Sequence, residues 1–151
     1  GIRLHIVAMA NSRQLLLDPR GIGRDWKKRL EETREGYSLE ELYRMVEANH
    51  LENLIAVDNT ASADFVGHYP EVLRHAFGLV SSNKIANTRS ISFYTGLRQV
   101  LKEHQKQYLY ETNVGAGLPL IDSIRLLHLS GEDGPLEIGE EVVSVMAFGD
   151  R

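Results

Sequence analysis

Short apolar runs alternate along this chain with longer segments in which apolar residues recur at helical spacing. The apolar runs predict strands over residues 4–10, 54–58, 79–82 and 108–111, and we expect the first two to be buried. Strands that alternate with helices are typical of parallel sheets built from βαβ units. We therefore expect the α/β class: a Rossmann-like three-layer parallel sheet with helices on both faces.

The polar stretch after the first predicted strand is expected to hold a turn and two helices. Asp18–Gly21 has the composition of a turn, and residues 25–35 are charged enough for a surface helix. Ser38 and Glu41 match a capping box, in which the serine begins the helix. Apolar residues recur behind them, so we expect a helix over 39–49.

A proline interrupts the next helical pattern, which covers residues 63–77. Pro70 predicts a break near His68–Tyr69, and Gly78 is expected at a helix C-terminus. Two further helices are expected over residues 90–106 and 118–129. The apolar side chains expected to face inward on the first of these two are Ile91, Phe93, Tyr94, Leu97, Val100 and Leu101.

Composition argues against several classes of protein. The chain has 151 residues, and its 17 basic against 21 acidic side chains argue against general nucleic-acid binding. It has no cysteine, which excludes disulfides and thiolate metal sites. No apolar run reaches the roughly 18 residues of a membrane span and no signal-peptide pattern opens the chain, so we expect a soluble, cytoplasmic protein.

Familiar catalytic and metal-binding motifs are absent from the sequence. The six histidines do not have the spacing of a metal site, and they are interpreted as structural or surface residues. The nucleophile elbow of α/β-hydrolases, the Walker lysine and the G-x-G-x-x-G fingerprint do not occur. Hydrolase and nucleotide-triphosphatase functions therefore lose their usual support.

In open parallel sheets the chemistry lies beyond the carboxyl ends of the strands. Four polar or glycine-rich loops follow the predicted strands, and they cover residues 11–13, 59–62, 81–87 and 111–118. We take these loops as the candidate functional site.

The first loop carries an arginine where a dinucleotide fold would place an acidic residue for the ribose hydroxyl. Arg13, with the small polar neighbours Asn11 and Ser12, suits a 2′-phosphate and hence NADP better than NAD. The alternative is an ordinary surface arginine that starts a helix.

The second and third loops offer hydroxyls and a positive charge. Thr60 and Ser62 open a helix, so they suit either an anion or amide site or a simple N-cap. Lys84 follows a predicted strand, where it would lie over a cofactor or substrate or else be a solvated loop lysine.

The fourth loop, Glu111–Pro119, has two glycines after a carboxylate. A carboxylate followed by free carbonyl groups can bind a hard cation through oxygen ligands. The alternative is a tight strand-to-helix connection without a ligand.

Four segments together resemble one family. Residues 8–13, 57–62, 83–88 and 111–119 occur in the order and at the spacing of homoserine dehydrogenases, especially the dehydrogenase half of bifunctional aspartokinase–homoserine dehydrogenases. The E-T-N-V-G-A-G-L-P stretch is specific, whereas the others are persuasive only as a set. The similarity extends from about Leu4 to about Glu132.

The resemblance implies an oxidoreductase that reduces aspartate semialdehyde to homoserine with NAD(P)H, on the route to threonine and methionine. It implies that Thr60 and Lys84 contact the nicotinamide cofactor and that Arg13 lies near the adenosine 2′-phosphate. It also implies a homo-oligomer, in the family a dimer, and a possible fused aspartokinase domain. A further implication is a sodium ion, with the side chain of Glu111 and the backbone carbonyls of Val114, Ala116 and Leu118 as its ligands.

The chain departs from the family pattern in several places. Ile85 stands where the family usually has a second lysine. The glycine-rich phosphate turn is expected before Leu4, and the substrate region with the catalytic lysine is expected after Glu132. We therefore assign no catalytic residue in this chain and expect an inactive fragment, an NAD(P)-binding domain that is incomplete relative to the family.

Residues 133–151 are expected to form a turn and a terminal strand of the same sheet, which would be either a rejoined strand or a displaced first strand. Residues 1–132 would then form the partial NAD(P)-binding domain. The alternative function for the chain is a non-catalytic dimerisation or interaction module that retains the fold.

Overall fold

The computed structural model describes residues 4–33, 36–114 and 118–130. The chain divides into two compact units between Glu52 and Asn53, which we call the hairpin unit and the sheet unit. Residues 115–117 of the fourth candidate loop and the predicted terminal strand lie outside the described residues. The predicted division at residue 132 stays a prediction for the same reason.

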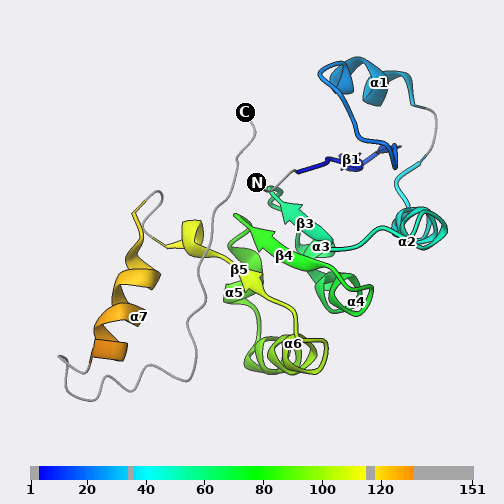
Figure 1. Cartoon of the computed structure of the whole chain (residues 1–151). Helices are drawn as coiled ribbons and strands as arrows, with labels where there is room; N and C mark the ends of the chain where they lie inside the picture. Colours follow the sequence, from blue (N-terminus) through cyan, green and yellow to red (C-terminus); the bar gives the residue numbers. More distant parts are fainter. Residues whose placement is uncertain (1–3, 34–35, 115–117, 131–151) are drawn as a thin grey trace. The chain divides into compact units, whose positions relative to one another are not determined.

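The sheet unit is built on three parallel strands, which confirms the predicted α/β class. They are β3 (Ile55–Asp58), β4 (Gly78–Ser81) and β5 (Tyr108–Leu109), in the spatial order β3-β4-β5 (Figure 1). Asp58 pairs with Ser81 in the register of β3 and β4. Because the strands are parallel, their carboxyl ends and the loops that follow them meet at one edge of the sheet.

One face of this sheet carries the core. Asp58, Leu79, Ser81 and Tyr108 face that side and are buried, as the period of two along a strand requires. Ile55 and its neighbour two positions on, Val57, are more than half exposed on the other side. The prediction that residues 54–58 form a fully buried strand is therefore wrong, because the burial of β3 alternates.

The core of the sheet unit lies between the sheet and α4 (Tyr69–Arg74) and α6 (Ile91–Glu103), which run along the same side of it (Figure 1). Side chains from α3 (Ala63–Gly67) and α5 (Ile85–Thr88) complete it. The short helix α5 is absent from the sequence predictions. The buried members of the core are Val66, Tyr69, Leu73, Leu79, Ala86, Leu97, Val100 and Tyr108.

Serine side chains begin the helices where the sequence indicates. The hydroxyl of Ser62 accepts a hydrogen bond from the N–H of Phe65 at the start of α3. Ser90 does the same for the N–H of Phe93 at the start of α6. The predicted break before Pro70 is confirmed, since α3 ends at Gly67 and α4 begins at Tyr69.

Two predictions about helix positions are wrong. Gly78 does not follow a helix end but is the first residue of β4. Ile91 was expected to face inward, yet 76% of its surface is exposed, because it is the first residue of α6. The expectation holds for Leu97 and Val100, which are buried further along the same helix.

Three helices end in the same way without glycine. His50, Ala76 and Gln105 have φ values of 50°, 68° and 52°, in the left-handed region, just after α2, α4 and α6. In each case the next residue donates its N–H to a carbonyl five positions back, which is the Schellman pattern. The bond from Phe77 to Val72 is 3.3 Å long. Helix α4 thus ends at Arg74, and three residues separate it from the start of β4 at Gly78.

The hairpin unit differs from the sequence prediction at its first strand. β1 (Ala8–Ala10) pairs antiparallel with β2 (Leu15–Leu17), so it does not belong to a parallel sheet. Leu4 is 81% exposed, and Ile6 is exposed as well. The prediction of a buried strand over 4–10 is therefore wrong, and β2, which is absent from the predictions, carries the buried side chains Leu15 and Leu16 instead.

A turn and two helices follow β2 as the sequence indicates. The carbonyl of Asp18 accepts the N–H of Gly21, whose φ of +111° suits glycine, so the predicted turn is confirmed. The Arg29 guanidinium, 2.9 Å from the Asp18 carboxylate, lowers the pKa of that carboxyl. The predicted helices are α1 (Trp26–Glu32) and α2 (Leu39–Ala48).

The last described element is α7 (Leu120–Ser130). It confirms the helix predicted over residues 118–129 and ends one residue beyond that range. Among the residues that the structure describes, none of the helices has the length and apolar content needed to cross a membrane.

Core burial predicts two contrasting alanine variants. Leu73→Ala should lower the free energy of unfolding by about 2–5 kcal/mol, because it leaves a cavity under α4 where the side chain is fully buried. Ile91→Ala should change it by no more than about 0.5 kcal/mol, because the side chain is exposed. Urea denaturation followed by far-UV circular dichroism compares the two, and equal losses would contradict the described face of α6.

Candidate functional site

Three of the four candidate loops meet at the carboxyl edge of the sheet unit. The hydroxyl of Ser82, after β4, donates to the side-chain oxygen of Asn59, after β3, at 3.2 Å. After β5, the short 3-10 helix η1 (Glu111–Asn113) contributes Asn113, whose side-chain amide donates to the carbonyl of Asn83 at 3.4 Å. The segments that carry Thr60, Lys84 and Glu111 are thus joined to one another.

A buried carboxylate lies at the centre of this edge. Asp58 is the last residue of β3 and only 1% exposed. Its Oδ2 accepts hydrogen bonds from the hydroxyl of Tyr69 at 2.6 Å and from the side-chain amide of Asn83 at 3.1 Å. Its Oδ1 accepts the backbone N–H of Thr60 at 2.8 Å. Three donors thus compensate the loss of water around this carboxylate.

Tyr69 connects β3 and β4 from the face of the sheet that carries the core. Its hydroxyl oxygen is 2.8 Å from Oγ of Ser81, the residue paired with Asp58 across the sheet. Burial, and then the bond to Asp58, raises the pKa of the Tyr69 hydroxyl well above its ordinary value. The phenol therefore stays protonated and donates to Asp58, which leaves Ser81 to donate to the phenol oxygen.

The side chain of Asn83 joins the loop after β4 to the loop after β3. Its amide nitrogen lies 3.1 Å from the carbonyl oxygen of Ser62 and 3.4 Å from Oγ1 of Thr60, in addition to its bond to Asp58. Its Oδ1 accepts the N–H of Ile85, in the first turn of α5, at 3.1 Å. We call Asp58, Tyr69, Ser81 and Asn83 the buried hub.

The predicted cofactor residues of these two loops lie around the buried hub. Thr60 is exposed, and its hydroxyl also accepts the N–H of Ser62 at 3.1 Å. Ser62 is the N-cap of α3, so the structural alternative holds for this residue. Lys84 is exposed at the start of α5, one residue after Asn83. A cofactor role for Thr60, Ser62 and Lys84 stays a prediction.

The first candidate loop, residues 11–13, belongs to the hairpin unit. The side-chain oxygen of Asn11 accepts the N–H groups of Arg13 and Gln14, both at 2.8 Å, so Asn11 shapes the turn between β1 and β2. Ser12 and Arg13 are exposed in that turn. The alternative that Arg13 is a surface arginine at the start of a helix is therefore wrong in one respect. Arg13 is exposed, but it lies in a turn between two strands.

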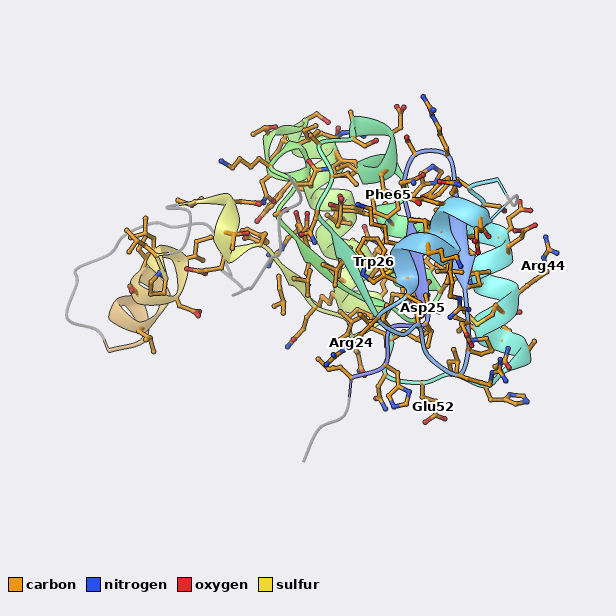
Figure 2. All side chains as sticks on the ribbon, turned by 90° about the horizontal axis from the view of Figure 1, so that it is seen from above. Arg24, Asp25, Trp26, Arg44, Glu52 and Phe65 are labelled. Atoms are coloured by element: carbon orange, nitrogen blue, oxygen red, sulfur yellow. The ribbon has the colours of Figure 1, made fainter. Side chains whose placement is uncertain are left out.

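The hairpin unit also has an open hollow of about 420 Å³. It contains none of the predicted site residues. Arg24 and Trp26, labelled in Figure 2 at the start of α1, contribute to it. The lining residues are Ile6, Met9, Ile22, Gly23, Arg24 and Trp26.

The side chain of Glu111 caps the N-terminus of α7. One carboxylate oxygen accepts the backbone N–H groups of Ile121 at 2.9 Å and Asp122 at 3.4 Å. Glu111 is only 6% exposed, and its other oxygen, Oε2, is buried without a hydrogen-bond partner among the described residues. An unsatisfied buried carboxylate oxygen fits a cation, which prefers such ligands.

The other predicted cation ligands are less informative. Val114 and Leu118 are more than half exposed, and Ala116 lies outside the described residues. Within the described part of the chain, no group of three or more His, Cys, Asp or Glu side chains is placed to hold a metal. A cation here would therefore depend on Glu111 and on backbone carbonyls.

Sequence reasoning gave no role to Asp58, Tyr69 or Asn83. Asp58 and Asn83 lie in two of the segments that resemble the family. The hydrogen bonds of Asp58 to Tyr69 and to Asn83, however, join residues that are 11 and 25 positions apart along the chain. The sequence signal for these residues was an acidic residue at the carboxyl end of an apolar strand. A carboxylate that is buried there requires hydrogen-bond donors from elsewhere in the chain.

The chain is similar to one family over most of its length. The family model described as homoserine dehydrogenase, NAD binding domain, matches residues 2–111. A bifunctional aspartokinase/homoserine dehydrogenase of Haemophilus influenzae is 37% identical over 144 residues, which are 95% of this chain and 17% of that protein. A homoserine dehydrogenase of Schizosaccharomyces pombe is 30% identical over 72% of this chain and 29% of its own length. The chain thus spans less than a third of these relatives.

Two solved structures share the fold. Homoserine dehydrogenase of Thermoplasma acidophilum matches with a TM-score of 0.61 at 20% identity, over 83% of this chain and 40% of that one. A Candida auris protein of unknown function matches with a TM-score of 0.70 at 22% identity, over 84% of this chain and 36% of that one. These likenesses agree with a Rossmann-type fold.

The contacts of Glu111 predict a structural loss on truncation. Glu111→Ala should lower the free energy of unfolding by about 1–3 kcal/mol, because two N–H groups at the start of α7 lose their acceptor. Glu111→Gln keeps an acceptor oxygen and should cost less. Glu103→Ala, at an exposed carboxylate of α6, is the control and should change stability by no more than about 0.5 kcal/mol. Urea denaturation measures all three, and equal losses for Ala and Gln would contradict the capping role.

Proposed function

This chain belongs to the homoserine dehydrogenase family through its NAD-binding domain, and from that premise we propose that it binds NADP(H) for the interconversion of aspartate semialdehyde and homoserine. The observation that carries the proposal is the meeting of three loops around the buried hub at the carboxyl edge of the sheet. Open α/β sheets bind their ligands at this edge. The exposed side chains of Thr60 and Lys84 would hold the cofactor there.

The residues of this chain would bind and orient rather than transfer protons. When bound, the reduced cofactor supplies a hydride to the aldehyde carbon, and a proton on the resulting oxygen completes the alcohol. The ammonium group of Lys84 would attract a negatively charged or polar part of the cofactor or substrate. No side chain of this chain is proposed as the proton donor.

We further propose that the hairpin turn selects NADP over NAD. Arg13 presents an exposed guanidinium in a turn that Asn11 holds in place, with Ser12 beside it. A guanidinium binds phosphate through two parallel hydrogen bonds, so it would distinguish a 2′-phosphate from a 2′-hydroxyl.

A sodium ion beside Glu111 is also proposed. Its support is the buried Oε2 of Glu111, which has no hydrogen-bond partner among the described residues. The backbone carbonyls of Val114, Ala116 and Leu118 would supply the remaining oxygen ligands, since sodium accepts such oxygens readily. The ion would fix the segment between η1 and α7.

The names of the relatives suggest a fusion to a second enzyme domain. Several of them, including the Haemophilus protein, are fused to an aspartokinase, and we propose the same for the protein from which this domain derives. A role in threonine and methionine biosynthesis, dimerisation and a cytoplasmic location remain predictions from the family resemblance and the sequence.

The proposed selectivity predicts the behaviour of one arginine variant. In titrations followed by nucleotide fluorescence, Arg13→Ala should weaken NADPH binding by about ten- to a hundredfold, the effect of one charge-assisted contact. NADH binding should change by less than about twofold, because NADH has no 2′-phosphate. Arg44→Ala is the matched control, since Arg44 projects outward from α2 of the same unit (Figure 2).

Equal weakening of both nucleotides by Arg13→Ala, or an equal effect of Arg44→Ala, would contradict the phosphate assignment. Binding of neither nucleotide by the unsubstituted chain below millimolar concentration would favour the interaction-module alternative.

The sodium proposal predicts a salt-specific stabilisation. The melting temperature should rise by about 2–4 °C in sodium chloride relative to tetramethylammonium chloride at equal ionic strength, because a ligand of the folded state stabilises it. Glu111→Gln should abolish this difference, whereas the control Glu103→Gln should retain it. Identical melting temperatures of the unsubstituted chain in both salts would refute the site.

A further inference from the structure

The proposed cofactor contacts Thr60 and Lys84 lie on two loops that are joined by other side chains of the same loops. Thr60 and Lys84 are both exposed, and each lies on a different strand-to-helix connection. A single ligand that contacts both would need these connections to keep a fixed separation, because binding geometry is sensitive to shifts of about 1 Å. Other residues must therefore fix the separation of the two connections.

The buried hub is positioned to do this. Oδ1 of Asp58 holds the N–H of Thr60 itself, and Oδ2 holds the amide of Asn83. Oδ1 of Asn83 in turn holds the N–H of Ile85, which follows Lys84 directly. One continuous chain of hydrogen bonds therefore links the backbone at Thr60 to the backbone beside Lys84.

The hub is closed off from water and tied to the core. Asp58, Ser81 and Asn83 are at most 2% exposed, and Tyr69 is fully buried. The ring of Tyr69 packs edge-on against Phe65 and Tyr108, with centroids 6.0 and 5.7 Å away. In such surroundings a polar group that loses its partner finds no water to replace it, so the arrangement of the hub is strongly preferred over alternatives.

We propose that Asp58 and Asn83 are positioning residues that hold the Thr60 and Lys84 loops in the one arrangement that binds the nicotinamide cofactor, with Tyr69 orienting the Asp58 carboxylate. This inference rests on the proposed function for its ligand, but not for the coupling of the two loops. It assigns no cofactor contact to the hub residues. Their effect passes through the backbone at Thr60 and Ile85.

The coupling is tested by amide hydrogen exchange of the full 151-residue chain, read across the hub. Asn83→Ala should speed exchange at Thr60 about tenfold, although the direct acceptor of that N–H, Asp58, is still present. Asp58→Asn should likewise speed exchange at Ile85, whose acceptor Asn83 is unchanged. Tyr69→Phe retains the ring and removes only the hydroxyl, so it gives a milder variant should the others fail to fold.

Val100→Ala separates positioning from general loss of stability. Val100 is buried in α6 and has no hydrogen bond to the hub, so this variant removes only core packing. It should lower the melting temperature as the hub variants do, but leave the exchange of Thr60 and Ile85 unchanged relative to the amides of β4. Unchanged exchange across the hub in Asn83→Ala and Asp58→Asn would overturn the coupling.

The link to the cofactor is tested by titrating the same variants with NADPH and NADH. Asn83→Ala and Tyr69→Phe should weaken both nucleotides about equally and by about tenfold, because the nicotinamide end is common to both. Affinities that match those of Val100→Ala would overturn the positioning role even if the loops are coupled. Should the unsubstituted chain bind neither nucleotide, the proposed function and the positioning role would both fail, and the exchange data would still decide whether the loops are coupled.

Discussion

The parallel register that sets Asp58 beside Ser81 determines the arrangement of the loop edge of the sheet. Both side chains face the side covered by helices, so a carboxylate enters the core at the end of β3. Its burial is tolerated only because donors from α4 and from two loops surround it. The packing of Tyr69 and the course of the loops after β3 and β4 therefore depend on the same carboxylate.

Features governed by local chemistry could be predicted from the sequence. The serine caps of α2 and α3, the helix break before Pro70 and the Asp18–Gly21 turn all depend on residues within a few positions of one another. The parallel sheet also followed from the alternation of strands and helices. The family resemblance indicated four functional loops, and three of them are joined in the structure.

Features that depend on distant pairing could not be predicted. β2 lies in the polar stretch for which the sequence predicted a turn and helices but no strand. Its pairing with β1 depends on the turn that Asn11 stabilises between the two strands. Asp58 and Asn83 are 25 positions apart, so their contact needs the sheet topology as well as the residue types. Gly78 suggested a helix end by composition, but the backbone uses Ala76 for that purpose.

The repeated helix endings have a consequence for the stability of the domain. An L-residue in the left-handed region costs on the order of 1 kcal/mol relative to glycine. His50, Ala76 and Gln105 each carry this cost at a connection that leads into a strand. Ala76 and Gln105 lie on the helix-to-strand connections of the sheet unit, at the end of its parallel sheet opposite to the loop edge. The sheet unit thus keeps an unused margin of stability, open to glycine substitution at these two positions, away from its loop edge.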